Sequence, residues 1–109
     1  MVKKRNSVEK DILITVRNYI HELRKNNINI CDAYLYGSYV KKSASADSDI
    51  DVAIISDSFS GDWFKDITLL LKLRRHIDVR IEPLPFTPAD FNSSQPLYYH
   101  IKRSGLKIA

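Results

Sequence analysis

The chain has 109 residues, of which 44% are hydrophobic, and a net charge of +4 at pH 7. This length suits one domain over residues 1–109 and excludes two independent cores. No run approaches the roughly 20 apolar residues that span a membrane, and the basic N-terminal segment lacks the apolar stretch of a signal peptide. The single cysteine, Cys31, excludes an internal disulfide and is typical of a reducing compartment, so the sequence predicts a cytoplasmic protein.

Hydrophobic periodicity predicts alternating helices and strands. Apolar residues recur at helical spacing in some segments and alternate with polar residues in others. The predicted order is helix, strand, strand, helix, strand, short helix and edge strand, at residues 8–25, 32–36, 50–55, 63–75, 77–82, 96–102 and 106–108. Pro83, Pro85 and Pro88 predict a rigid extended connector after the third strand. This order predicts an α+β fold, with a small mixed β-sheet and helices packed on one face.

Two short polar motifs flank the first two predicted strands. Gly37 and Ser38 follow the apolar run that ends at Tyr36, and Asp49-Ile50-Asp51 opens the next strand. Residues two apart on a strand share a face, so the two aspartates should point the same way. Carboxylates at the start of a buried strand are costly unless they are paired or bind a cation. The pair therefore suits a magnesium ion that carries a nucleoside triphosphate, although a solvated polar turn explains a lone D-x-D equally well.

A third acid, Asp78, lies in the predicted strand at 77–82. If that strand lies beside the strand of Asp49 and Asp51, Asp78 completes a cluster of three carboxylates. Such a cluster could hold two divalent ions, and Asp78 could assist the attacking hydroxyl as a base. The alternative is a surface acid that pairs with Arg80.

The spacing of these motifs resembles a known signature. Gly-Ser, ten residues and then D-x-D are similar to the signature of the DNA polymerase β-like nucleotidyltransferase superfamily, and the short chain resembles its minimal nucleotidyltransferase branch. In that family the Gly-Ser turn binds the triphosphate and the acids bind magnesium. The resemblance implies nucleotide binding by Gly37, Ser38 and Lys41, and metal binding and catalysis by Asp49, Asp51 and Asp78. The chain departs from the family at Lys42, where glycine is usual, which affects the loop and no metal ligand.

The same resemblance implies a function. Family members use ATP as substrate and magnesium, with two ions, as cofactor. Minimal nucleotidyltransferases of the family often accompany a small helical HEPN protein in a toxin–antitoxin module, in which AMP moves from ATP to a tyrosine of the HEPN ribonuclease. By resemblance, this chain is a protein adenylyltransferase and the antitoxin of such a pair.

Two other functions stay open. The chain could transfer a nucleotide to a small molecule or to RNA, as a homo-oligomer with a shared cleft, or it could be an antitoxin that acts by binding alone. Basic residues also cluster in four segments that could mark a surface for RNA or for an acidic protein: Lys3 to Arg5, Lys41 and Lys42, Lys72 with Arg74 and Arg75, and Lys102 and Arg103. A solvated surface explains these cations as well.

Overall fold

The computed structural model describes residues 10–41 and 48–109. Within these residues the chain forms four helices and four strands, in the order α1 Lys10–Lys25, β1 Asp32–Tyr36, α2 Ser38–Lys41, β2 Ile50–Ile55, α3 Trp63–Arg74, β3 Ile81–Phe86, α4 Pro96–Ser104 and β4 Leu106–Lys107. None of the helices in these ranges has the length and hydrophobicity needed to cross a bilayer. The α+β class and the mixed sheet that the sequence predicts are confirmed.

The four strands form one sheet in the order β3-β2-β1-β4. β1 pairs antiparallel with both β2 and β4, whereas β2 and β3 are parallel and α3 connects them. Parallel neighbours require such a crossover, because a short turn cannot bring the chain back to the same end of the sheet. As a result, the last residues of β1 and the first residues of β2 and β3 meet at one end of the sheet.

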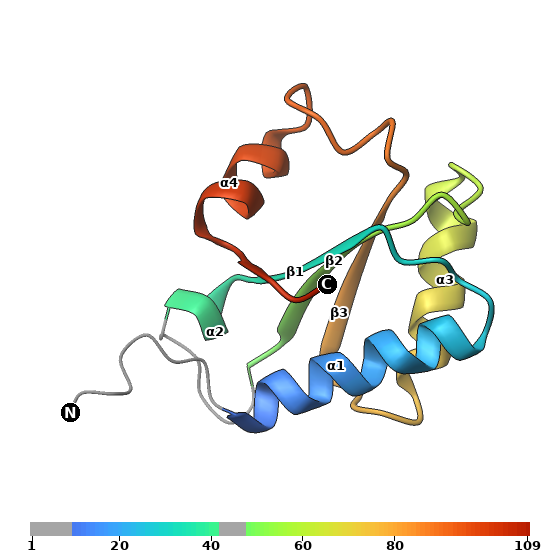
Figure 1. The fold of residues 1–109 in the computed structure, drawn as a ribbon, viewed down its shortest axis with the longest axis vertical. Coiled ribbons are helices and arrows are strands. Elements are labelled where there is room, and N and C mark those ends of the chain that lie inside the picture. Colours follow the sequence, from blue (N-terminus) through green and yellow to red (C-terminus); the bar gives the residue numbers. More distant parts are fainter. Residues whose placement is uncertain (1–9, 42–47) are drawn as a thin grey trace.

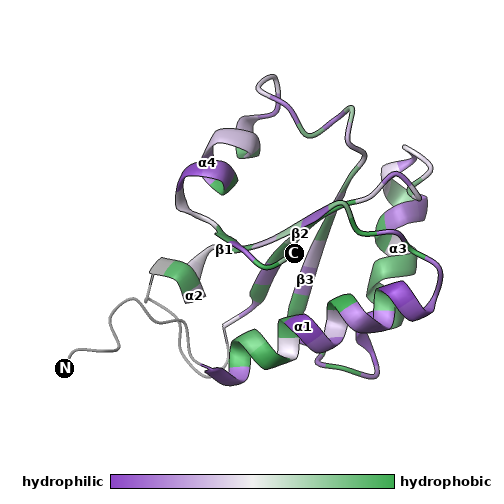
Figure 2. Cartoon of the chain, in the orientation of Figure 1, coloured by the Kyte–Doolittle hydropathy of each residue, from purple (hydrophilic) through white to green (hydrophobic). Residues whose placement is uncertain are grey.

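α1 packs on the sheet through one apolar side. Its buried residues recur at intervals of three and four, which is the spacing of one helix face, and they are Ile12, Val16, Tyr19, Ile20 and Leu23. The predicted helix is confirmed from Lys10 onward, and its predicted first residues, 8 and 9, lie outside the described residues. Figure 2 shows purple and green alternating along α1, as this one-sided burial requires.

Each face of the sheet has its own apolar cluster. On the first face, which α1 and α3 cover, Leu35, Val52 and Ile54 are fully buried. On the second face, Ile101 of α4 packs against a smaller cluster that includes Ala53. Figure 1 shows α1 and α4 on opposite sides of the sheet. The expected cover by helices on one face therefore holds for α1 and α3, and α4 adds partial cover to the other face.

The position predicted for the third strand is wrong. Residues 75–80 coil after α3, and β3 begins only at Ile81. The backbone nitrogens of Ile77 and Asp78 both donate to the carbonyl oxygen of Arg74, which continues the helical path. The prolines expected in a connector, Pro83 and Pro85, lie inside β3 instead.

β3 accommodates its prolines because it is an edge strand. The backbone nitrogens of Ile50 and Ser56 in and after β2 donate to the carbonyl oxygens of Arg80 and Phe86, at 2.8 and 3.0 Å. In β3, the backbone N–H and C=O groups of even-numbered residues therefore point toward β2. The backbone nitrogens of odd-numbered residues point away from the sheet. Pro83 and Pro85 are odd-numbered, so the missing N–H groups remove no hydrogen bond from the ladder.

Candidate active site

Three polar side chains form a row across the second face of the sheet. Asp51 in β2 lies opposite Tyr36 of β1 and in register with Glu82 of β3. Cross-strand partners project from the same face of a sheet. These three residues therefore lie side by side at the end where β1 finishes and β2 and β3 begin. We call them the Tyr36–Asp51–Glu82 row.

The absence of a side chain at Gly37 leaves room for the carboxylate of Asp51. This glycine follows β1 directly and has a φ of +83°, a conformation that residues with a side chain rarely adopt. A Cβ at this position would overlap the Oδ2 oxygen of Asp51. Ser38 then begins the short helix α2, which is closed by a hydrogen bond of 3.1 Å from the Val40 nitrogen to the Gly37 carbonyl oxygen. The Gly-Ser turn, which ends one strand, and Asp51, which opens the next, therefore meet at one end of the sheet.

The acids in this region repel one another. Burial first, and then the charges of Asp49 and Glu82, raise the pKa of the Asp51 carboxyl above its usual range. Burial and the charges of Asp51 and Glu82 also raise the pKa of Tyr36 to about 12. Asp49 itself is exposed, just before β2. A cation held among these carboxylates would relieve the repulsion.

The oxygen donors at this site fit a magnesium ion. Carboxylates are ligands that magnesium prefers, and the charges of Asp49 and Glu82 both act on Asp51. Among residues 10–41 and 48–109, no group of three or more His, Cys, Asp and Glu side chains is arranged to hold a metal ion by itself. A magnesium ion bound here would therefore need water and phosphate oxygens as further ligands, which is common for magnesium in proteins.

Asp78 does not join this row. It lies in the turn before β3, and Arg80 donates to its carboxylate from the backbone nitrogen, Nε and Nη2, the last at 2.8 Å. These hydrogen bonds from Arg80 hold the pKa of Asp78 below its usual range. The placement of Asp78 on a strand beside Asp51 is wrong, because the coil at 75–80 moves the start of β3. The pairing of Asp78 with Arg80, the alternative from the sequence, is what the structure shows.

Glu82 occupies the place predicted for Asp78. It lies in register with Asp51, and its side chain is 50% exposed. Arg74 of α3 approaches it, with Nη1 lying 3.5 Å from the Oε2 oxygen of Glu82 and donating to the Ile81 carbonyl oxygen at 2.6 Å. The alternation of Asp78, Arg80 and Glu82 is visible in the sequence. Because of Pro83 and Pro85, the strand predicted from the sequence ends at residue 82. Prolines are tolerated in a sheet only where their nitrogens face outward.

Comparison with known families decides what kind of protein carries these motifs. The family profile described as "Polymerase beta, Nucleotidyltransferase" matches residues 18–109, which include β1, the Gly-Ser turn and all the acids named above. The chain belongs to this nucleotidyltransferase family. The resemblance stated from the Gly-Ser and D-x-D spacing is thereby confirmed at the level of the family.

A solved structure gives the same fold for this nucleotidyltransferase. The crystal structure of a provisionally assigned nucleotidyltransferase from Sulfolobus solfataricus matches with a TM-score of 0.61, at 13% sequence identity. The match covers 89% of this chain and 78% of that chain. A search of proteins with curated functions gives no match.

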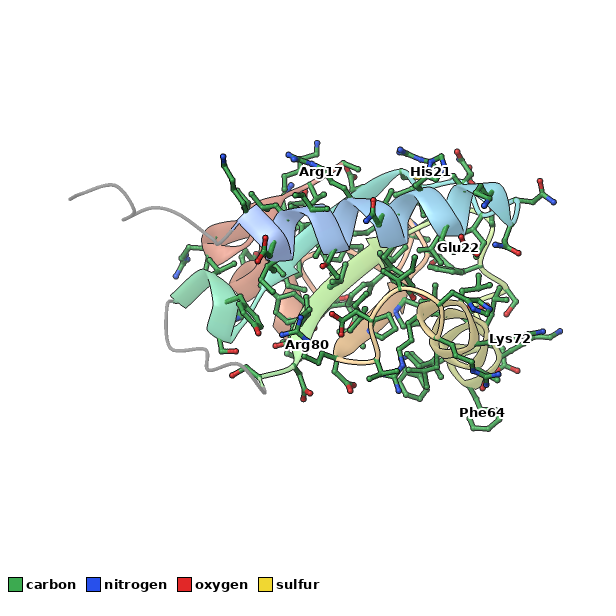
Figure 3. The ribbon with its side chains drawn as sticks, turned by 90° about the horizontal axis from the view of Figure 1, so that it is seen from below. Arg17, His21, Glu22, Phe64, Lys72 and Arg80 are labelled. Carbon is green, nitrogen blue, oxygen red and sulfur yellow. The ribbon has the colours of Figure 1, made fainter. Side chains whose placement is uncertain are left out.

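Arg80 connects two parts of the nucleotidyltransferase site. Besides its contacts with Asp78, its Nη1 donates to the Tyr39 hydroxyl of α2 at 3.1 Å. Tyr39 is buried, so this bond ties the start of β3 to the helix that follows Gly37. Figure 3 shows Arg80 close to the first residues of β2, in line with the hydrogen bond from the Ile50 nitrogen to its carbonyl oxygen. Asp78 therefore positions Arg80, which in turn positions α2.

Two lysines complete the set of residues predicted from the sequence. Lys41 is the last residue of α2, and the prediction for its side chain as a triphosphate contact falls outside the described part of the chain. Lys42, where the family often has glycine, is also outside the described residues. The roles of both lysines stay predictions.

Proposed function

We propose that this nucleotidyltransferase moves AMP from ATP to a protein in a magnesium-dependent reaction. The observation that carries the proposal is the Tyr36–Asp51–Glu82 row beside Gly37, in a chain of the nucleotidyltransferase family. Asp49 and Asp51 hold the metal in this proposal. Glu82 replaces Asp78 as the third carboxylate, because Glu82 lies in register with Asp51 and Asp78 is bound to Arg80.

The residues divide the reaction between them. Gly37 and Ser38 hold the triphosphate, and magnesium, when bound, neutralises phosphate charge and makes the acceptor hydroxyl easier to deprotonate. The hydroxyl oxygen forms a bond to the α-phosphorus of ATP while the bond from that phosphorus to the bridging oxygen breaks. Pyrophosphate leaves, and the hydroxyl proton passes to Glu82, whose half-exposed carboxylate faces the open side of the sheet.

We further propose that the acceptor is a tyrosine of a HEPN-type helical partner, with this chain as the antitoxin of the pair. The described residues form one four-stranded sheet with its helices, and these ranges include no separate substrate-binding domain. An acceptor that brings its own binding surface, such as a folded protein, suits this arrangement better than a small molecule that would need an enclosed pocket.

The test uses the purified chain, magnesium and ATP labelled on its α-phosphate. The acceptor is the product of the neighbouring gene where that gene encodes a helical protein, and an RNA oligonucleotide is the alternative acceptor. Wild type is compared with Asp49→Asn/Asp51→Asn and with the exposed-acid control Asp90→Asn. We expect label on a tyrosine of the partner with wild type and with Asp90→Asn, and a loss of about a thousandfold or more in the double variant.

Other outcomes separate the alternatives. Label on RNA alone would replace the protein acceptor with a nucleic acid. Tight binding of the partner without any transfer, equal in wild type and in the double variant, would favour an antitoxin that acts by binding. Absence of magnesium-dependent ATP binding would contradict the proposal as a whole.

A further inference from the structure

A basic groove lies beside the C-terminal half of α3. Its volume is about 480 Å³, and it lies between α3 and the coil at 75–80. Its walls combine three cations with apolar and hydroxyl groups and are formed by Thr68, Leu71, Lys72, Arg74, Arg75 and Val79. Three of these six residues are one of the basic segments of the sequence, which the proposed reaction does not use.

Two of the three cations of the groove are available for a partner, since Arg74 is already paired with Glu82. Lys72 and Arg75 are exposed, and within the described residues neither has a carboxylate at ion-pair distance. Figure 3 shows Lys72 projecting from α3 away from the sheet. The two exposed cations attract an anionic ligand, and the attraction is strongest at low salt.

One side chain of the groove contacts the acid row. Arg74 lines the groove, and its Nη1 atom lies 3.5 Å from the Oε2 oxygen of Glu82. A molecule bound in the groove is therefore adjacent to the carboxylate that we assign to the acceptor side of the reaction. A second groove, at Arg17, His21 and Arg24 on α1, also carries cations but has no contact of this kind with the acid row.

The apolar part of the groove decides which anion it fits. Val79 is 67% exposed, and Leu71 is partly buried beside the cations. Single-stranded nucleic acids are usually held by aromatic residues that stack on bases, and this groove is lined by none. Aliphatic side chains flanked by cations instead match a protein segment in which apolar and acidic residues are mixed.

We propose that this groove binds an acidic segment of the protein acceptor and so brings the acceptor hydroxyl to Glu82. The inference rests on the proposed transfer to a protein and adds the surface that selects it. Binding in the groove itself needs neither ATP nor magnesium, because Lys72 and Arg75 lie outside the acid row.

The test measures binding of a fluorescent glutamate–tyrosine copolymer, which presents acidic residues and acceptor hydroxyls together. Wild type is compared with Lys72→Glu/Arg75→Glu and with the matched control Arg17→Glu/Arg24→Glu, which changes the net charge by the same amount on α1. We expect fluorescence anisotropy to show binding to wild type and to the control. Affinity should fall by about tenfold or more in the groove variant and should also weaken as salt is added.

Transfer to the copolymer is measured in parallel with labelled ATP and magnesium. We expect the groove variant to raise the KM for copolymer and to leave magnesium-dependent ATP binding unchanged, whereas Asp49→Asn/Asp51→Asn abolishes transfer and still binds copolymer. Circular dichroism of each variant confirms that the fold is intact. Neutral Lys72→Gln/Arg75→Gln provides a second variant without introduced repulsion.

The two proposals fail in different ways. Equal loss of copolymer binding in the groove variant and the α1 control would overturn the groove and leave the catalytic proposal standing. Preferential binding of an RNA oligonucleotide at the groove, lost in Lys72→Gln/Arg75→Gln, would overturn the protein segment in favour of a nucleic acid. Copolymer binding that depends on the groove, without any ATP binding by wild type, would support the groove and sink the proposed transfer.

Discussion

The two faces of the sheet bury different amounts of apolar surface and carry different chemistry. On the first face, α1 and α3 enclose a large cluster in which Leu35, Val52 and Ile54 are fully buried. On the second face, α4 covers a smaller cluster, and the Tyr36–Asp51–Glu82 row lies at one end. The repulsion among the acids is tolerated because the first face supplies most of the packing. Substitutions on the two faces should therefore separate stability from activity.

The largest expected effect comes from Glu82 on the second face. Glu82→Gln keeps the shape of the side chain but removes a charge from the row, so we expect kcat to fall by about a hundredfold to a thousandfold. Asp78→Asn removes an acid of the same region that lies outside the row, so its kcat should fall by less than about tenfold. Steady-state transfer of labelled AMP measures both. If Asp78→Asn proved the more damaging of the two, Asp78 would regain its place as the third carboxylate.

The next expected effect compares how much the packing on each face contributes to stability. Leu35→Ala leaves a cavity on the first face and should lower the free energy of unfolding by about 3 kcal/mol. Leu84 is only partly buried on the second face, so Leu84→Ala should lower the free energy of unfolding by about 1 kcal/mol. Urea unfolding followed by circular dichroism gives both values. Similar losses at the two positions would mean that the faces contribute equally to stability.

Alanine substitutions at two glycines separate the effect of the contact between Gly37 and Asp51 from the effect of backbone conformation. Gly37 and Gly61 both have positive φ, +83° and +90°, but a Cβ at Gly61 would meet nothing within 4 Å. Gly61→Ala should therefore cost about 1 kcal/mol of stability through the backbone alone. Gly37→Ala should cost more and should also weaken magnesium-dependent ATP binding, because the new methyl group displaces the Asp51 carboxylate. Equal ATP binding by the two variants would show that this contact is unimportant.

The smallest expected effect concerns the stability of metal-free protein, to which Asp51 and Asp78 should contribute pH dependences of opposite sign. The pKa of Asp51 is raised in the folded state, so its ionised form weakens folding above that pKa, and the penalty is gone below the unfolded pKa of about 3.9. The pKa of Asp78 is lowered by Arg80, so its contribution is full above about 3.9 and is lost as pH falls through the folded pKa.

Two variants measure these signs. At pH 7, Asp51→Asn should raise the free energy of unfolding and Asp78→Asn should lower it, each by about 0.5 kcal/mol after solvent screening. Both differences should disappear in strong acid, where the carboxyls are protonated in the folded and unfolded states alike. Thermal unfolding in the presence of a chelator, repeated across pH, provides the comparison. A gain in stability from Asp78→Asn at pH 7 would contradict the pairing with Arg80.

Local patterns predicted most of the fold and one of the three residues of the row, Asp51. The period of the apolar residues in α1 and the alternation of Ile50, Val52 and Ile54 identify their elements, because each pattern is complete within a few residues of chain. The places of Gly37 at the end of one strand and of Asp51 at the start of the next are likewise readable from the sequence. These parts need no knowledge of distant contacts.

The register of β3 could not be predicted in this way. Whether Asp78 or Glu82 lies beside Asp51 depends on where the chain leaves α3, and that point is set by backbone hydrogen bonds to Arg74. Phe64 shows the same limit. Its place three residues before the buried Ile67 puts it on the same side of α3 by helical spacing, but its side chain is 74% exposed. Periodicity identifies a helix face, but the position of neighbouring elements decides which part of that face is covered.

The prolines at the outer edge of β3 limit how copies of the protein can associate. Pro83 and Pro85 present no N–H groups to a strand from another molecule, and β4, at the opposite edge, spans only two residues. A continuous intermolecular sheet, the usual start of fibril growth, is therefore blocked at one edge and short at the other. A homodimer of this chain would have to assemble through side chains of its helices and loops, and concentrated solutions should resist fibril formation.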